Sequence, residues 1–291
     1  MTDTIKFQPA GRSRPRRFVS THKRATVGAA ILVFMLLAAF VGPWLSPYAP
    51  YDQDVLRRLE PPSLDHWLGT DQFGRDVLVR LMVGAQLSLL IGFASTLFAM
   101  IVGSALGMIA AWHGRNVDAV IMQAMDVLLA FPSLLLGLVI VAMLGPSVTN
   151  IVIAIGVTSI PIFARVARAP TIAIKEREYI EAGRALGYSD TRILGGHVLP
   201  NMLPDVFVMA VMWLATAIRT EASLAFIGLG VRPPTPTWGG MIYSGFENLF
   251  EAPHLAIIPS IAILLLVFSI TLIGDGLRSE LDPKLRNEVS Q

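Results

Sequence analysis

Long apolar stretches without charged residues alternate with short polar segments along this chain. No Asp, Glu, Lys or Arg occurs in four of these stretches: Ala25–Tyr51, Leu81–Gly114, Val127–Ala164 and Ala252–Gly274. A helix of about 20 apolar residues crosses a hydrocarbon core of about 30 Å, and each stretch reaches that length. The pattern predicts an all-α, polytopic membrane protein with six transmembrane helices: Ala25–Leu45, Gly84–Trp112, Val117–Leu144, Val148–Arg168, Leu203–Leu229 and His254–Leu277.

The composition agrees with a bilayer protein and excludes several other classes. Of the 291 residues, 54% are hydrophobic and 15% are charged, whereas soluble domains carry about 25% charged residues. A net charge of +2 is too small to indicate a nucleic-acid partner. The absence of cysteine excludes disulfides and thiolate metal sites. The histidines show no close ligand spacing such as HExxH, so we expect neither a metal site nor a cofactor.

The distribution of basic residues predicts the orientation. Lys and Arg near span ends are retained in the cytoplasm, and most of them lie in the N-terminal tail, around the loop after the fourth span, and after the sixth span. Both termini are therefore expected in the cytoplasm. The first span is too long for the apolar part of a cleaved signal, so it is interpreted as an anchor. The expected organisation is a cytoplasmic tail (1–24), an anchor helix (25–45), an extracytoplasmic loop (46–83), a five-helix core (84–277) containing a cytoplasmic loop (169–202), and a second cytoplasmic tail (278–291).

The cytoplasmic loop carries the most informative pattern. Pro170 suits the first turn of a short helix, and Gly187 suits its left-handed end. A second short helix is expected to begin after Ser189 and to stop at Leu199-Pro200-Asn201. One face of the first helix carries small residues next to Leu186, and small side chains allow another backbone to approach closely. The loop is therefore interpreted as a docking element for a soluble partner.

The same loop resembles a known motif. Glu181-Ala182-Gly183, three residues, Gly187, nine residues and His197-Val198-Leu199-Pro200 match the spacing of the EAA loop of bacterial ABC importer permeases, E-A-A-x3-G-x9-I-x-L-P. Gly183 replaces the second Ala of that pattern, and His197 replaces the Ile. Glu181, Gly187, Leu199 and Pro200 remain in register.

Further segments narrow the resemblance to one group of these permeases. These segments are His66–Val77, Glu221–Val231, Gly274–Arg278 and Leu281–Lys284. They are similar to stretches of the C-type permease subunit of the dipeptide, oligopeptide and nickel importers. The resemblance covers nearly the whole chain beyond the N-terminal tail.

The resemblance implies a fold, a set of partners and a role for the loop. The fold would be the type I importer permease, a five-span core preceded by one additional N-terminal helix. The partners would be a homologous second permease, two cytoplasmic ABC ATPases and an extracytoplasmic solute-binding protein. The loop would be the coupling helix that sits in a cleft of one ATPase. The residues expected to couple to the ATPase are Tyr179, Glu181, Ala182, Gly183, Ala185, Leu186 and Gly187.

Several residues inside the spans are candidates for the translocation path or its gate, because a charge left in lipid costs about 2.5 kcal/mol or more. Arg219 and Glu221 lie two residues apart in the fifth span, so they point to different faces. The alternative is that both only anchor the span at the headgroups. In the third span, Asp126 faces protein or water, either as a path residue or as a structural hydrogen-bond acceptor, and Pro132 permits a bend. Arg165 and Arg168 lie at the end of the fourth span, where they either reach lipid phosphate or take part in gating.

The chain is not expected to be an enzyme, because no lysine follows a glycine as a P-loop requires. It is expected to be a permease subunit of an ATP-driven importer in the bacterial cytoplasmic (inner) membrane, moving peptides or similar small solutes. The alternative is an ion-gradient-driven secondary transporter, a class that usually shows internal repeats. A membrane-embedded hydrolase is a third class, but no nucleophile–base pair is evident. The solute is left open among peptides, nickel chelates and glutathione.

Overall fold

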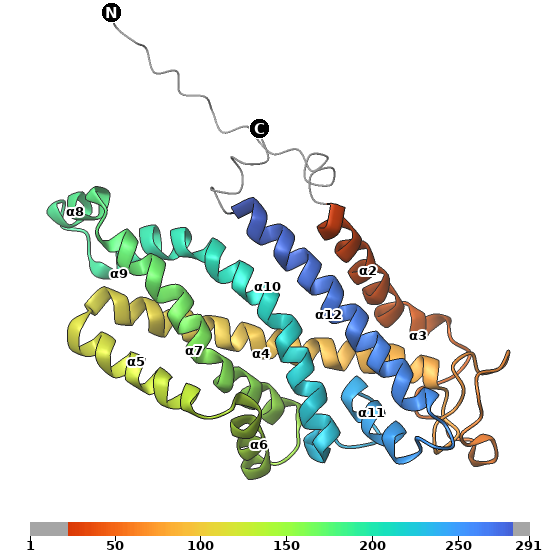
Figure 1. Ribbon diagram of the computed structural model, residues 1–291. Helices are drawn as coiled ribbons and strands as arrows, with labels where there is room; N and C mark the ends of the chain where they lie inside the picture. Colours follow the sequence, from red (N-terminus) through yellow and green to blue (C-terminus); the bar gives the residue numbers. More distant parts are fainter. Residues whose placement is uncertain (1–22, 282–291) are drawn as a thin grey trace, which may run out of the picture.

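The computed structural model describes residues 23–281, and their secondary structure is almost entirely helical (Figure 1). In chain order the elements are α2 (Lys23–Phe40), α3 (Gly42–Leu45), η1 (Val55–Arg57), α4 (Val77–His113), α5 (Arg115–Ala130), α6 (Ser133–Leu144), α7 (Val148–Lys175), α8 (Glu178–Ala185), α9 (Asp190–Ile193), η2 (Leu194–Val198), α10 (Leu199–Leu224), η3 (Ala225–Leu229), α11 (Trp238–Glu247) and α12 (His254–Leu281). Most of both predicted tails lies outside the described residues.

Five of the predicted spans are continuous helices long and apolar enough to cross a membrane. The third predicted span, Val117–Leu144, consists of two helices: α5 and α6 meet at an angle of 89°, at the position where Pro132 was expected to permit a bend. The break falls at Phe131 and Pro132, both of which have extended backbone torsions. A proline disfavours helical torsions at the preceding residue, which explains why the helix ends there. The described residues contain six spans if α5 and α6 are counted together as one broken span.

α7 continues beyond the end predicted for the fourth span. It runs through Pro170 to Lys175, so the prediction that Pro170 begins a separate helix is wrong. The last turns are held by tertiary contacts: Ile174 is buried, and Lys175 Nζ donates to the carbonyl of Trp112 at 2.5 Å. A proline inside a helix removes one backbone hydrogen bond, and these contacts offset that loss.

The prediction that Pro200 stops a helix is also wrong. α9, η2, α10 and η3 follow one another as a single apolar segment from Asp190 to Leu229, which stays helical through Pro200 and leaves helical torsions only at Gly228. Pro200 lies in the first turn of α10, directly after the wide π-helical turn of η2, where a missing N–H is tolerated. Gly187 does end α8 as predicted, with a φ of 80° and its N–H donated to the carbonyl of Arg184 at 2.9 Å.

Helices α4, α7 and α10 form the centre of the molecule. Phe163 of α7 is fully buried in a cluster with Ala99 of α4 and Met202 of α10. A second cluster joins Ile218 of α10 to Leu266 of α12, and α2 and α4 contribute alanines to it. α2 therefore lies along α12 at one edge of the bundle, while α5 and α6 lie at the opposite edge (Figure 1).

Candidate functional site

α8 projects past the span helices, toward the same side of the molecule as the start of α2 and the end of α12 (Figure 1). Its exposed surface contains most of the predicted coupling residues. Tyr179 and Leu186 are 47% and 74% exposed, and Glu181, Ala182, Ala185 and Gly187 are exposed as well. Gly183 differs, because it is buried against Tyr188 and does not belong to the outer face. The small-residue surface therefore consists of Ala182 and Ala185.

The inner side of α8 is fixed to the bundle by an apolar cluster. Ile180 is fully buried with Ile193, Val198 and Trp112, and Trp112 lies in the last turn of α4. The guanidinium of Arg184 stacks 4.7 Å from the centre of the Trp112 ring. The sequence motif contains Arg184 and Ile180, but the contact with α4 is visible only in three dimensions. α8 is therefore packed against the end of α4, one of the central helices.

Two ion pairs join α5 to α7. Asp126 and Arg165, predicted separately as path or gate residues, lie together at 2.6 Å, with side chains 61% and 55% exposed. Further toward the start of α5, Arg168 forms a bidentate pair with Asp118 at 2.5 and 2.6 Å. The sequence did not point to Asp118. These four residues line an open groove of about 330 Å³ between the two helices.

Arg219 and Glu221 occupy opposite environments on α10, as their spacing predicts. Arg219 is exposed, and its guanidinium donates to the hydroxyl of Thr216 at 3.1 Å. Glu221 is 1% exposed and accepts a hydrogen bond from the hydroxyl of Ser88 on α4 at 3.2 Å. Its second carboxylate oxygen has no hydrogen-bond partner among the described residues. The two charges therefore do not pair with one another.

The buried carboxylate of Glu221 lies beside the first turn of α11. The backbone N–H of Trp238 donates to Ser88 Oγ at 3.2 Å, which links α11 through Ser88 to Glu221. Trp238 also donates its indole N–H to the carbonyl of Leu81 at 2.9 Å, and Thr237 caps α11 by accepting the N–H of Gly240. Glu221 thus holds α11 against α4 and α10.

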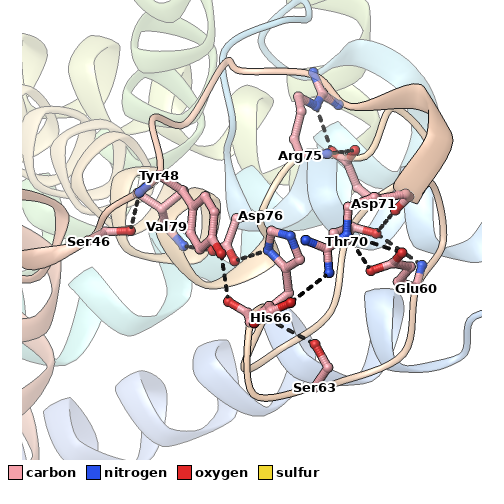
Figure 2. A network of polar contacts seen from close by, with 12 residues as sticks. Ser46, Tyr48, Glu60, Ser63, His66, Thr70, Asp71, Arg75, Asp76 and Val79 are labelled. Atoms are coloured by element: carbon pink, nitrogen blue, oxygen red, sulfur yellow. Dashed lines mark hydrogen bonds and ion pairs between the residues drawn. The ribbon is translucent and has the colours of Figure 1, made fainter.

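A compact lobe, residues 46–76, covers the starts of α4 and α12, and its polar contacts are drawn in Figure 2. The His66 ring lies 2.9 Å from Asp76 and stacks on Tyr48, with ring centres 4.5 Å apart. Asp76 also caps α4 by accepting the N–H of Val79. α4 therefore begins at Val77, before its predicted start at Gly84. The sequence alone did not identify this pairing.

Arg80 connects the lobe to the loop before α11. Its guanidinium pairs with Asp71 at 3.2 Å and donates to the carbonyl of Pro50 at 2.8 Å and to that of Pro234 at 3.4 Å. Asp71 also binds Arg75 at 2.7 Å (Figure 2). All three charged side chains are buried, so the lobe and this loop are fixed to the same end of α4.

The described residues form a bundle of long apolar helices, with the short helix α8 exposed at one end of it, as expected of a polytopic membrane protein. The chain belongs to the family described as "binding-protein-dependent transport system inner membrane component", whose model matches residues 103–287. A second model, the "N-terminal TM domain of oligopeptide transport permease C", matches residues 16–62. The chain is therefore a permease subunit of an ABC importer, and the ion-gradient-driven alternative is not favoured.

Individual relatives agree with this membership. The chain is 42% identical to the dipeptide transport system permease protein of Alkalihalophilus pseudofirmus, covering 91% of this chain and 88% of that protein. It is also 42% identical to the glutathione transport system permease protein of Pectobacterium atrosepticum, covering 94% of this chain and 90% of the relative. A solved structure of the MetNI methionine ABC transporter in an inward-facing conformation has a similar fold, with a TM-score of 0.56 and 19% identity over 69% of this chain and 95% of the other.

Proposed function

We propose that this permease pairs with a homologous second permease, and that the two together form the path for peptides or similar small solutes. The dipeptide and glutathione permeases support this solute class, because they match the chain over most of their length. The other partners are two cytoplasmic ABC ATPases and an extracytoplasmic binding protein that delivers the solute. The ATPases hydrolyse the nucleotide, since the chain has no P-loop lysine.

The observation that carries the proposal is the exposed surface of α8 on its buried stem. Tyr179, Glu181 and Leu186 are available to a partner, while Ile180 and Arg184 bind the helix to the end of α4. Closure of the ATPases around nucleotide would move α8 as a lever, and the helix bundle would switch from inward-facing to outward-facing. The work comes from the different affinity of nucleotide for the two states.

The path and its gate are assigned to the face formed by α5, α7 and α10. The Asp126–Arg165 pair and the bend at Pro132 form a cytoplasmic gate, because breaking an exposed ion pair costs little and lets α5 move relative to α7. Arg219 lines the path farther along, and Glu221 borders the path where it holds α11 against α4 and α10.

The chain is placed in the cytoplasmic (inner) membrane of a bacterium with both termini in the cytoplasm. The excess of Lys and Arg around α8 and in the two tails supports this orientation. α2 then serves as the anchor preceding the five-span core, the lobe faces the binding protein, and α8 faces the ATPases.

The test is a complex reconstituted in liposomes with ATPases, second permease and binding protein. Glu181→Ala and Gly187→Trp are expected to reduce ATPase co-purification and ATP-driven solute uptake together. The first removes an exposed carboxylate from α8, and the second places a bulky side chain where φ is 80°. Glu251→Ala, which removes an exposed carboxylate beyond α11, is the matched control and should leave both quantities unchanged.

Unchanged uptake and unchanged ATPase association in both α8 variants would show that the coupling role is wrong. Uptake by the chain alone, without ATP and along an ion gradient, would contradict the proposed function as a whole.

A further inference from the structure

Arg219 lies within a span helix and has no acidic partner among residues 23–281, unlike three other arginines of the bundle. Three of the others each contact a carboxylate: Arg80 with Asp71, Arg165 with Asp126, and Arg168 with Asp118. Arg219 contacts only the hydroxyl of Thr216, and no residue among 23–281 forms an ion pair with it. Glu221, the nearest acid in sequence, is turned to the opposite side and bound to Ser88. The charge of Arg219 is therefore exposed and uncompensated within this subunit.

The position of Arg219 excludes lipid as its normal surroundings. It lies ten residues before Leu229, about 15 Å from the end of the helix, and so within the span. An uncompensated arginine at such a depth faces protein or a water-filled cavity, because exposure to hydrocarbon is costly. The face of α10 that carries Arg219 therefore borders an aqueous space or a partner subunit.

The backbone beyond Arg219 favours the aqueous space. At Gly228 the chain leaves helical torsions, with a φ of 90° and a ψ of 6°, and this residue is exposed. Non-helical backbone in a span is tolerated where it is buried in protein or lines a water-filled cavity. Within this subunit Gly228 is exposed and has no heavy atom within 4 Å of the position that a Cβ would take, as expected of backbone that lines a cavity.

The side chains around Arg219 can bind other groups of a ligand besides a negative charge. Thr220 and Ser223 donate their hydroxyl protons to the carbonyls of Thr216 and Arg219, at 3.0 and 2.9 Å, so their oxygens remain free to accept N–H groups. Two turns farther, about 10 Å along the same face, Phe226 meets Phe246 of α11 edge to face at 5.5 Å. The face thus offers a cation, hydroxyl acceptors and an exposed aromatic wall.

From this arrangement we infer that Arg219 is a solute-binding residue that receives a carboxylate in the translocation path. A guanidinium binds a carboxylate through two parallel hydrogen bonds, a geometry that lysine does not reproduce. The hydroxyl oxygens of Thr220 and Ser223 accept N–H groups of the same molecule. The ligand class is a small solute with a free carboxylate and N–H donors, such as a short peptide. This inference rests on the proposed function, and it adds that Arg219 recognises the carboxylate of the solute.

The experiment uses the full reconstituted complex, with radiolabelled L-alanyl-L-alanine as the probe. Arg219→Gln is expected to lower the maximal uptake rate about tenfold or more, because a charged hydrogen bond is lost. The concentration of loaded binding protein at half-maximal uptake should not change. ATP hydrolysis stimulated by loaded binding protein should stay within about twofold, since a path contact acts on the solute and not on the nucleotide.

Two further variants separate charge from structure. Arg219→Lys keeps the positive charge but lacks the planar guanidinium that makes two parallel hydrogen bonds, so it should recover part of the lost uptake. Arg24→Gln removes an exposed arginine at the start of α2 and should behave as the wild type. Each variant is also checked for co-purification with the second permease.

The outcomes are distinguishable. If the wild-type complex moves no dipeptide, the proposed function fails in its solute class, and this inference fails with it. If the wild type moves the dipeptide and Arg219→Gln matches it, only the inference is overturned. If Arg219→Gln no longer co-purifies with the second permease, Arg219 forms an ion pair with an acidic residue of that subunit. Equal losses of uptake and ATP hydrolysis would make it a structural residue. Either result overturns the inference.

Discussion

Ile180 provides the sharpest test of how α8 is attached to the bundle. Its side chain is fully buried among Ile193, Val198 and Trp112. Ile180→Ala removes three carbon atoms, each of which contributes about 0.8 kcal/mol when buried, and it leaves a cavity. The free energy that holds α8 against the bundle is therefore expected to fall by about 3 kcal/mol, inside the range of about 2 to 5 kcal/mol that is typical of such substitutions. A loss of 3 kcal/mol shifts the ratio of attached to detached α8 by about a hundredfold. The outer residues of α8 are untouched, so the variant separates attachment from docking.

The assay combines hydrogen exchange with transport. Amides of residues 178–187 should exchange faster in Ile180→Ala, because detachment exposes the short helix to solvent. Solute moved per ATP hydrolysed should fall, since a detached α8 no longer transmits displacement to α4. Ile257→Ala on α12, where the side chain is 51% exposed, is the matched control and should change neither quantity. Unchanged exchange in α8 would refute the reasoning, as would fast exchange with undiminished coupling.

The remaining predictions concern contacts farther from α8. A double-mutant cycle on Asp118→Asn and Arg168→Gln, measured by thermal unfolding in detergent, should give a coupling of about 1 kcal/mol, because these side chains are 20% and 35% exposed. Glu221→Leu should destabilise the protein by about 2 kcal/mol and speed hydrogen exchange of residues 237–247, because the hydrogen bond from Ser88 is lost. Glu221→Gln still accepts that hydrogen bond and should keep most of the stability. Equal losses of stability in the two variants would contradict the role of Glu221 in holding α11. Asp76→Ala should cost about 1 to 2 kcal/mol by removing the cap of α4, and Asp76→Asn, which still accepts, should cost less in the same unfolding measurement.

Local sequence rules failed where tertiary contacts outweighed them. Pro170 and Pro200 are helix-ending signals by themselves, yet the chain remains helical through both. At Pro170 the buried Ile174 and the Lys175 contact hold the helix, and at Pro200 the preceding π turn accommodates the ring. At Pro132 the local rule held, because this residue was expected to permit a bend and α5 and α6 meet there at 89°. A proline acts on about one turn of backbone, so the surrounding packing decides whether the helix continues.

The sequence by itself determined that the chain spans a membrane, where most spans lie, and which loop carries the family motif. Those features depend on hydrophobicity summed over about 20 residues and on fixed spacing, both of which are local. Tertiary structure alone decided which charges meet. Asp126 meets Arg165, Asp118 meets Arg168, and Arg219 has no acidic partner among residues 23–281. Ion pairing depends on distances of a few ångströms between residues far apart in the chain, and only the packing of α5, α7 and α10 sets those distances.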